Sequence, residues 1–323
     1  MLKLGTTGPE VFPIGLGCQR FSGGFAATDD AESIATIQAA IDAGITLLDT
    51  GDFYGMGHNE QLVGKAIAER RDRVQLSVKF GGQRAPDGTF VGIDARPASV
   101  KNFASYSLKR LGVDVIDIYR PARLDRSVPI EDTVGAIADL IKAGYVKHIG
   151  LSEMGAGTVR RAHATHPIVD LQIGYALSTR EPEAQIFPAL DELGISATLY
   201  GVLGHGLLGG SKAEAGDARA HLPRFAAENR ATNDAVVATL RRFAEARGMT
   251  SAQLAIAWAI AKQPRFVTLV GVRNRAQLAS ALGALDHALT APDVAELEAA
   301  VPESAFAGER YAPALMKFLD RET

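Results

Sequence analysis

Three residues in the first quarter of the sequence could together move a proton. Asp49 ends the apolar run ITLLDT, Tyr54 follows in the segment GDFYG, and Lys79 stands near the end of the next apolar run, VQLSVKF. Adjacent strands lie about 4.8 Å apart, so Asp49 and Lys79 could form an ion pair if they end neighbouring strands. An ammonium within about 4–6 Å lowers the pKa of a tyrosine from its usual value of about 10, which would make Tyr54 a general acid or base. The spacing fits equally well a structural ion pair beside a tyrosine that only packs.

The elements that must position these residues are short apolar runs rich in β-branched side chains. Near-continuous apolar runs of this kind are typical of strands buried on both faces. The sequence contains such runs at 11–17, 45–50, 74–80, 115–120, 146–152, 169–175, 196–201 and 266–272.

Amphipathic helical patterns separate these runs and have recognisable ends. Asp29 and Glu32 form a capping-box pattern before an apolar stripe that stops at Gly44, and prolines 97 and 129 begin two further helices. Eight strands with helical connections fit a closed (β/α)8 TIM barrel better than an open doubly wound sheet, which has five or six strands. We therefore predict an α/β fold with one barrel domain over residues 1–323.

Additions to the barrel account for the length of the chain. The sequence has 323 residues, whereas such barrels typically have about 250. The segment KLGTTGPEV is predicted to form an N-terminal β-hairpin with its turn at Thr7–Gly8. The remaining excess lies from Leu203 to Arg230 and after Leu289, which predicts extended loops toward the C-terminus. Catalytic groups of these barrels lie at the C-terminal ends of the strands, where Asp49 and Lys79 are expected.

Composition narrows the class of protein. A hydrophobic content of 47% can form a core, which excludes a disordered chain, and a net charge of −3 provides no basic excess for nucleic acid. The longest uncharged run, 194–211, is interrupted by glycines and does not resemble a membrane span. The N-terminus lacks the apolar core of a signal peptide, and the one cysteine, Cys18, cannot form an internal disulfide. We expect a cytoplasmic protein without a metal site, and nothing in the sequence specifies an oligomeric state.

Several motifs in order resemble those of the aldo-keto reductase superfamily. The segment DTGDFYGMGHNE resembles its signature, in which an Asp-Thr strand end is followed by Tyr-Gly and Asn-Glu. SVKF supplies the lysine, and GLSE, LQIGY, LYGVLGHGLLGG and LVGVRNRAQLASALGAL follow, so the match extends over nearly the whole chain. The resemblance implies an NADPH-dependent reductase of a small-molecule carbonyl substrate on a (β/α)8 barrel. It also implies that Asp49, Tyr54 and Lys79 are three members of the catalytic tetrad.

The resemblance also implies where NADPH or NADP+ binds. In the family an aromatic ring stacks on the nicotinamide, polar side chains bond its carboxamide, and a glycine-rich backbone contacts the pyrophosphate. Because a guanidinium can clamp a phosphate through two hydrogen bonds, Arg273, or Arg275 beside it, is the candidate for the 2′-phosphate. Glu153 stands where Asn is common, and Ala281 replaces an Asn near the adenine. The implied cofactor-binding residues are Asp49, Ser152, Gln172, Tyr200, Leu203, Gly204, Gly206, Gly271, Arg273 and Gln277.

The glycines at 204–209 also satisfy the GxGxxG pattern of dinucleotide-binding folds. That fingerprint normally opens the first βαβ unit of its fold, whereas here it follows the seventh predicted strand. In a barrel, glycines after the seventh and eighth strands allow backbone N–H groups to approach a phosphate. We therefore interpret the pattern as a barrel phosphate site.

One member of the tetrad is absent. The family usually has a histidine after the fourth strand, and Ala122 occupies that position in the segment YRPARLD. Three interpretations remain open: a working reductase whose substrate has its own polar group, a slow enzyme, or a cofactor binder without turnover. The pattern Ala-Arg-hydrophobic-Asp is similar to the pyridoxal reductase branch, which predicts reduction of pyridoxal to pyridoxine. The alternative is an NADP(H)-binding sensor or regulatory module that resembles potassium-channel β-subunits.

Aromatic residues near the predicted strand ends are candidates for pocket walls. They are Phe21, Phe25, Phe53 and Tyr119. Trp258 lies in the apolar helical run QLAIAWAIA and is predicted to pack in the core.

Overall fold

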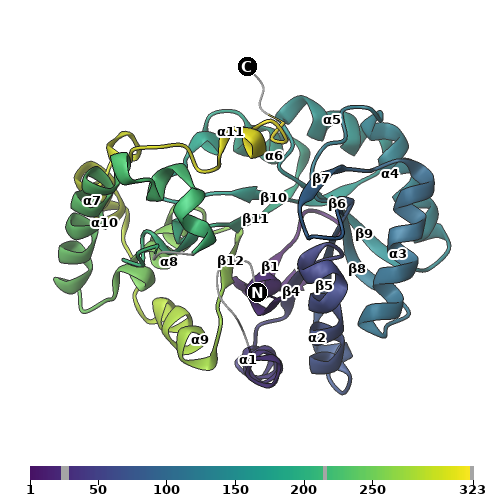
Figure 1. Ribbon diagram of the computed structural model, residues 1–323, viewed down its shortest axis with the longest axis horizontal. Helices are drawn as coiled ribbons and strands as arrows, with labels where there is room; N and C mark the ends of the chain where they lie inside the picture. The colour runs from purple at the N-terminus through teal and green to yellow at the C-terminus, as the bar shows by residue number, and fades with distance from the viewer. Residues whose placement is uncertain (23–28, 214–216, 321–323) are drawn as a thin grey trace.

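Parallel strands form a closed barrel in the computed structural model, which describes residues 1–22, 29–213 and 217–320 (Figure 1). Its strands are β3 (Ile14–Gly17), β4 (Leu47–Gly51), β5 (Gln75–Phe80), β8 (Ile116–Pro121), β9 (Val146–Ser152), β10 (Ile168–Gly174), β11 (Ser196–Tyr200) and β12 (Val267–Gly271). They follow one another in chain order around the barrel, and β12 pairs with β3 to close it. The predicted TIM barrel is confirmed.

The N-terminal hairpin is also present, and it shortens the first predicted strand. Strand β1 (Leu2–Lys3) pairs antiparallel with β2 (Glu10–Val11) across a turn in which the Gly8 N–H donates to the Leu4 carbonyl at 3.0 Å. Leu4 and Val11 are fully buried in a small apolar cluster with barrel residues, so the hairpin covers one end of the barrel. Because Val11 belongs to the hairpin, the barrel strand begins only at Ile14.

Helices cover the outside of the barrel (Figure 1). They are α1 (Asp30–Asp42), α2 (His58–Ile67), α3 (Pro97–Leu111), α4 (Ile130–Lys142), α5 (Ala156–Thr165), α6 (Ile186–Leu193), α7 (Ala227–Glu245), α8 (Ser251–Lys262), α9 (Arg275–Leu282) and α10 (Ala291–Ala300), with the short α11 (Pro313–Met316) in the tail. The predicted capping box of α1 is only half formed. Asp29 accepts from the Glu32 N–H at 2.7 Å, but the Glu32 carboxylate binds Arg275 instead of returning to the cap. Among the described residues, no helix combines the length and apolar character of a membrane span.

Three of the predicted aromatic positions lie in the core. Trp258 is fully buried and stacks on Tyr175 at 5.2 Å between ring centroids, as expected for a core residue. Tyr119 is also fully buried, stacks on Phe80 at 4.3 Å, and donates its hydroxyl proton to the Val100 carbonyl. Its assignment to a pocket wall is therefore wrong, because the ring turns outward from the strand into the packing layer under α3. Phe21 is likewise buried in the core, and Phe25 lies outside the described residues.

Two additions lie over the rim where the barrel strands end. A small hairpin of β6 (Gly82–Arg84) and β7 (Phe90–Ile93) follows β5. The C-terminal tail, coloured yellow in Figure 1, runs from α10 to α11 and ends near α5. Phe318 of the tail packs edge-on against Phe90 at 5.1 Å, and the Gly155 N–H donates to the Asp320 carboxylate at 3.0 Å. These contacts attach the tail to the rim on which the predicted site residues lie.

Candidate active site

A buried ion pair lies at the ends of β4 and β5. Their register places Asp49 opposite Ser77 and Gly51 opposite Lys79, so the Lys79 side chain reaches back to the Asp49 carboxylate. The same carboxylate accepts hydrogen bonds from the Ser77 hydroxyl and the Gln172 amide, both at 2.8 Å. The side chains of Asp49 and Lys79 are only 3% and 4% exposed. Burial lowers the pKa of Lys79, and the adjacent Asp49 acts in the opposite direction.

Tyr54 lies directly over this pair. It begins a short 3-10 turn, Tyr54–Gly57, in which Gly55 and Met56 both have φ of 54°. The Lys79 Nζ atom is 5.0 Å from the centre of the Tyr54 ring. Gly55 is favourable at such a φ because it has no Cβ, and an added Cβ would lie 2.8 Å from the Ser22 side chain. The turn thus fixes Tyr54 at the rim with its hydroxyl enclosed.

The electrostatics of Tyr54 differ from the sequence prediction. Burial, followed by the charge of Asp49, raises the pKa of Tyr54 well above its usual value, and the cation that lowers it is Arg123. The prediction of a lowered pKa is therefore wrong for this structure, because burial and the Asp49 carboxylate outweigh the cation. Arg123 follows Ala122 directly, and the sequence placed it in the Ala-Arg-hydrophobic-Asp pattern without giving it a role of its own.

The residues expected at the nicotinamide lie together on neighbouring strands. Ser152 and Gln172 are register partners on β9 and β10, and Gly174 pairs with Tyr200 on β11. The Gln172 amide nitrogen is used by Asp49, which leaves its carbonyl oxygen for a ligand. This arrangement can present a hydroxyl, an amide oxygen and an aromatic ring to a carboxamide-bearing ring.

Glu153 differs in charge and in backbone preference from the asparagine that is common at this position. Its φ is 53°, a left-handed conformation that Asn tolerates better than Glu, and strain of this type concentrates at functional sites. The buried carboxylate accepts from the Gly174 N–H at 2.8 Å and the Tyr200 hydroxyl at 2.7 Å. Both terminal nitrogens of Arg310 also donate to it, at 3.0 and 2.5 Å. Arg310 and Arg123 hold the pKa of Glu153 below its usual value despite its burial.

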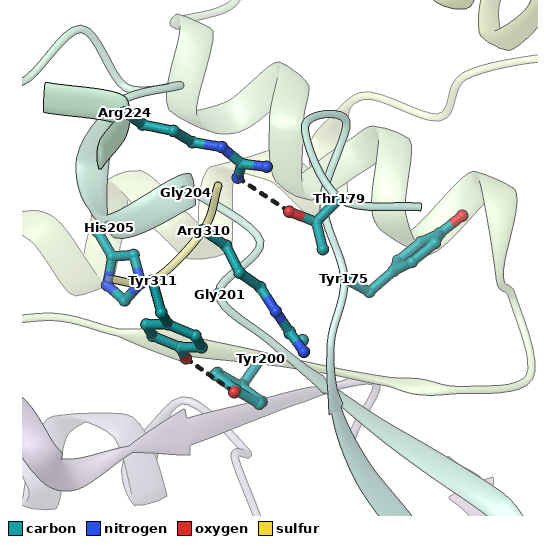
Figure 2. Close-up of a pocket in the computed structure, with 10 residues that line it drawn as sticks. Tyr175, Thr179, Tyr200, Gly201, Gly204, His205, Arg224, Arg310 and Tyr311 are labelled. Carbon is teal, nitrogen blue, oxygen red and sulfur yellow. Dashed lines mark hydrogen bonds between the residues drawn. The ribbon is translucent and has the colours of Figure 1, made fainter. Parts of the chain in front are cut away.

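The tail contributes two residues to the site that the sequence did not reveal. Figure 2 shows Arg310 and Tyr311 above Tyr200, with the hydroxyls of Tyr311 and Tyr200 joined at 2.9 Å. Together with Gly201, Gly204 and other residues they line a pocket at the end of β11. Arg310 and Glu153 are 157 positions apart in the sequence, and the tail around Arg310 has no periodic pattern, so no local signal could predict the contact.

The loop after β11 is a tight glycine-rich turn. Gly204, His205 and Gly206 all have positive φ, at 55°, 58° and 97°, a conformation also found in anion-binding turns. In this structure the N–H groups of Gly204 and Gly206 donate to the Gly201 and Leu203 carbonyls at 2.7 and 2.9 Å. Burial and the surrounding arginines lower the pKa of His205 to about 4, so its ring is neutral near pH 7. Arg219 contacts this loop, and its guanidinium donates a hydrogen bond to the His205 carbonyl at 3.2 Å.

Arginines gather beside this loop. Arg20, which follows β3, lies against Gly271 at the end of β12, where an added Cβ would be 3.2 Å from its side chain. Burial and the charges of Arg273 and Arg219 lower the pKa of Arg20 to about 10. Such crowding of like charges is relieved by a bound anion, so the residues present fit the phosphates of a dinucleotide. Arg20 was missed, although it lies only three positions beyond a strand end at the same rim.

The two candidates for the 2′-phosphate differ in their contacts. Arg275 forms a two-point ion pair with Glu32, at 3.2 Å through Nε and 2.9 Å through Nη2. The Arg273 N–H donates to the Gln277 side chain at 2.9 Å, and its guanidinium has no hydrogen-bond partner in the part of the chain that the structure describes. Arg273 is therefore the better placed of the two.

His58 contacts two side chains that are not part of the proposed site. Its ring nitrogens lie 3.1 Å from the Ser22 hydroxyl and 3.2 Å from Asp30. Within residues 1–22, 29–213 and 217–320, no group of three or more His, Cys, Asp or Glu side chains is arranged to hold a metal ion.

Comparisons with known proteins agree with this geometry. A family model described as the aldo/keto reductase family matches residues 13–302. A probable aldo-keto reductase 1 from Glycine max is 40% identical over 319 residues, which cover 96% of this chain and 91% of that protein. Among solved structures, a glycerol dehydrogenase from Gluconobacter oxydans has a TM-score of 0.83 at 26% identity, covering 93% of this chain and 95% of that chain. An aldo/keto reductase from Klebsiella pneumoniae in complex with NADP and acetate has a TM-score of 0.72 at 26% identity, covering 94% and 95%.

The matched region contains both the buried Asp49–Lys79 pair and the glycine loop beside the arginines. Enzymes of this family are NAD(P)H-dependent oxidoreductases that use NADP(H) and act on small-molecule carbonyl substrates. The resemblance seen in the motifs is confirmed over nearly the whole length, and the chain belongs to the aldo-keto reductase family.

Proposed function

We propose that the chain reduces an aldehyde or ketone to an alcohol with NADPH as the cofactor and Tyr54 as the proton donor. The observation that carries this proposal is the buried Asp49–Lys79 pair directly beneath Tyr54. The pair fixes the charges beneath the phenol, and the Arg123 cation favours the phenolate that forms when the proton leaves.

The residues of the chain have distinct roles in this proposal. NADPH, when bound, supplies a hydride to the carbonyl carbon. Arg20 and Arg273 would hold its phosphates beside the loop of Gly204 and Gly206. Tyr200 would support the nicotinamide ring, and Ser152 and Gln172 would bind the carboxamide. Tyr54 donates a proton to the carbonyl oxygen, while Asp49 keeps Lys79 charged and oriented.

For the substrate we propose pyridoxal, reduced to pyridoxine. The support is the segment Ala122–Arg123–Leu124–Asp125, which is similar to the pyridoxal reductase branch and lies at the end of β8. Ala122 cannot polarise a carbonyl, so a substrate with its own polar group beside the carbonyl is favoured. Pyridoxal has a phenolic oxygen next to its aldehyde.

The test compares Tyr54→Phe with the wild type in the oxidation of NADPH at 340 nm with pyridoxal. We expect a loss of about 10²–10⁴-fold in kcat, the usual contribution of a general acid, with little change in the Kd for NADPH. The exposed Tyr145 provides the matched control, and Tyr145→Phe should leave both quantities unchanged. Retained turnover in Tyr54→Phe would identify another proton donor. Reduction of simple aldehydes but not pyridoxal would exclude the substrate, and tight NADPH binding without turnover on a broad carbonyl panel would favour the sensor alternative.

A further inference from the structure

Ala122 stands at the position of the missing histidine, and its side chain has no hydrogen-bond donor. Ala122 is buried, and its N–H donates to the Phe80 carbonyl at 2.9 Å, continuing the ladder between β8 and β5. The methyl group therefore stands at the rim beside the strand that ends in Lys79 and Phe80. A substrate carbonyl oxygen placed beside Tyr54 therefore receives no hydrogen bond from the side chain at this position.

The side chain of Arg123 folds back toward Ala122. The Arg123 Nη1 atom donates to the carbonyl oxygen of Ala122 at 2.5 Å and lies 3.5 Å from the Ser152 hydroxyl. The guanidinium is thus held between the ends of β8 and β9, beside a residue expected at the nicotinamide carboxamide. It is enclosed although the residue as a whole is half-buried.

Arg123 retains unused donors and an uncompensated charge. A guanidinium has five N–H donors, and the hydrogen bonds of Arg123 to the described residues use only Nη1. No carboxylate in the described ranges lies within ion-pair distance of it. The nearby Glu153 is occupied by both nitrogens of Arg310. Arg123 is also the cation whose charge acts on Tyr54.

We propose that Arg123 replaces the missing imidazole: its guanidinium donates a hydrogen bond to the substrate carbonyl oxygen beside Tyr54, and a second N–H binds an oxygen adjacent to that carbonyl. This inference rests on the proposed function. The carbonyl carbon gains the hydride, its oxygen gains the Tyr54 proton, and the cofactor is oxidised. The Tyr54 phenolate then regains a proton from solvent, and Arg123 keeps all of its protons.

The substrate class follows from the shape of the group. An imidazole offers one N–H to a carbonyl, whereas the planar guanidinium offers two parallel donors. Carbonyls with a neighbouring hydroxyl or phenolate oxygen would use both donors, and an ortho-hydroxy aromatic aldehyde is the simplest probe. A guanidinium also stays charged at all working pH values, so its contribution does not titrate as that of a histidine would near pH 6.5.

The experiment measures single-turnover hydride transfer in the NADPH-loaded enzyme with 2-hydroxybenzaldehyde and 2-methoxybenzaldehyde. We expect Arg123→Met to lower the rate with the hydroxy substrate about 100-fold, the effect of removing one preorganised donor to a developing oxyanion, and to abolish the preference for the hydroxy over the methoxy substrate. The basic limb of the pH–rate profile should also move to higher pH, because the cation that favours the Tyr54 phenolate is gone. The Kd for NADPH should change less than about threefold.

Two further variants make the outcomes decisive. Arg123→Lys keeps the charge but not the fork, so it should retain the position of the basic limb and lose the hydroxy preference; it carries the test if Arg123→Met does not fold. Arg126→Met, in the same loop with a side chain that is 62% exposed, should behave as wild type. Unchanged rates and preference in Arg123→Met, in an enzyme that Tyr54→Phe inactivates, would overturn this inference alone. Absence of turnover in the wild type would overturn the proposed function with it.

Discussion

Arg310→Met should release the C-terminal tail from the active site at neutral pH. Arg310 is the only tail residue in the described ranges that forms an ion pair with Glu153, and the two side chains are 10% and 2% exposed. Methionine has a similar length but no charge, so the change removes the pair without leaving a large cavity. Glu153 would then be a buried carboxylate with no guanidinium bound to it.

The magnitude follows from the partners that remain. Breaking a buried ion pair from one side costs about 3–5 kcal/mol. Glu153 keeps the hydrogen bonds from the Gly174 N–H and the Tyr200 hydroxyl, so we expect about 2–3 kcal/mol, at or just under the lower limit of that range. Because the tail can detach while the barrel stays folded, the cost appears as easier local opening. At 1.4 kcal/mol per factor of ten, amides of residues 303–320 should exchange about 30- to 150-fold faster.

Hydrogen exchange measured by mass spectrometry at two pH values provides the assay. The folded-state pKa of Glu153 is depressed, so the pair stabilises the closed tail above the unfolded pKa of about 4.3 and is lost as the pH falls through the folded value. The difference between Arg310→Met and wild type should therefore be present at pH 7 and shrink below about pH 4. Arg126→Met removes a pair to Asp320 of the same tail, 3.6 Å long with the arginine side chain 62% exposed, and a hydrogen bond to the Leu319 carbonyl at 3.3 Å. It should accelerate exchange less than about fivefold. Equal protection in Arg310→Met and wild type at pH 7 would refute the reasoning.

Two further predictions concern the cofactor and the pH dependence of stability. Arg273→Ala should weaken binding of NADPH about 10–100-fold and leave NADH unchanged, while Arg275→Ala has a smaller effect because Glu32 holds that guanidinium; equal losses for both cofactors in titrations would contradict a 2′-phosphate role. Burial and Glu60 raise the pKa of Asp52 to about 7, from about 3.9 in the unfolded chain. The native state therefore favours the protonated carboxyl. As the pH rises between these two values, the free energy of unfolding falls by up to about 4 kcal/mol. Urea unfolding of wild type and Asp52→Asn between pH 4 and 8 should therefore diverge, with the variant relatively more stable at high pH, and parallel curves would exclude Asp52 as the cause.

The barrel was predictable because its signal repeats. Each strand is an apolar run bounded by a turn or helix cap, and the observed bounds differ from the predicted runs by a few residues. The exception is the first run, where Val11 pairs with Leu2 in the hairpin. Apolar periodicity does not distinguish a barrel strand from a hairpin strand when both are buried on the same cluster.

The site was predictable only where chemistry coincides with a strand end. Asp49, Lys79 and Gln172 follow that rule, and strand register brings them together. Arg310 and Tyr311 do not, because they reach the rim from a tail whose path depends on contacts such as Phe318 with Phe90. The pKa direction of Tyr54 was also beyond the sequence, since it depends on burial and on the balance of charges around the hydroxyl.

At both departures from the family pattern within the catalytic mouth, the structure places an arginine. Glu153 adds a negative charge where Asn is common, and Arg310 neutralises it through two hydrogen bonds. Ala122 removes a titratable donor, and Arg123 lies over it with a permanent charge. In the first case the Arg310 charge cancels that of Glu153, and the ion pair attaches the C-terminal tail to the barrel. In the second the Arg123 charge has no carboxylate partner at ion-pair distance among the described residues, so it is the charge left over at this part of the rim and the one we propose for a substrate oxygen beside Tyr54.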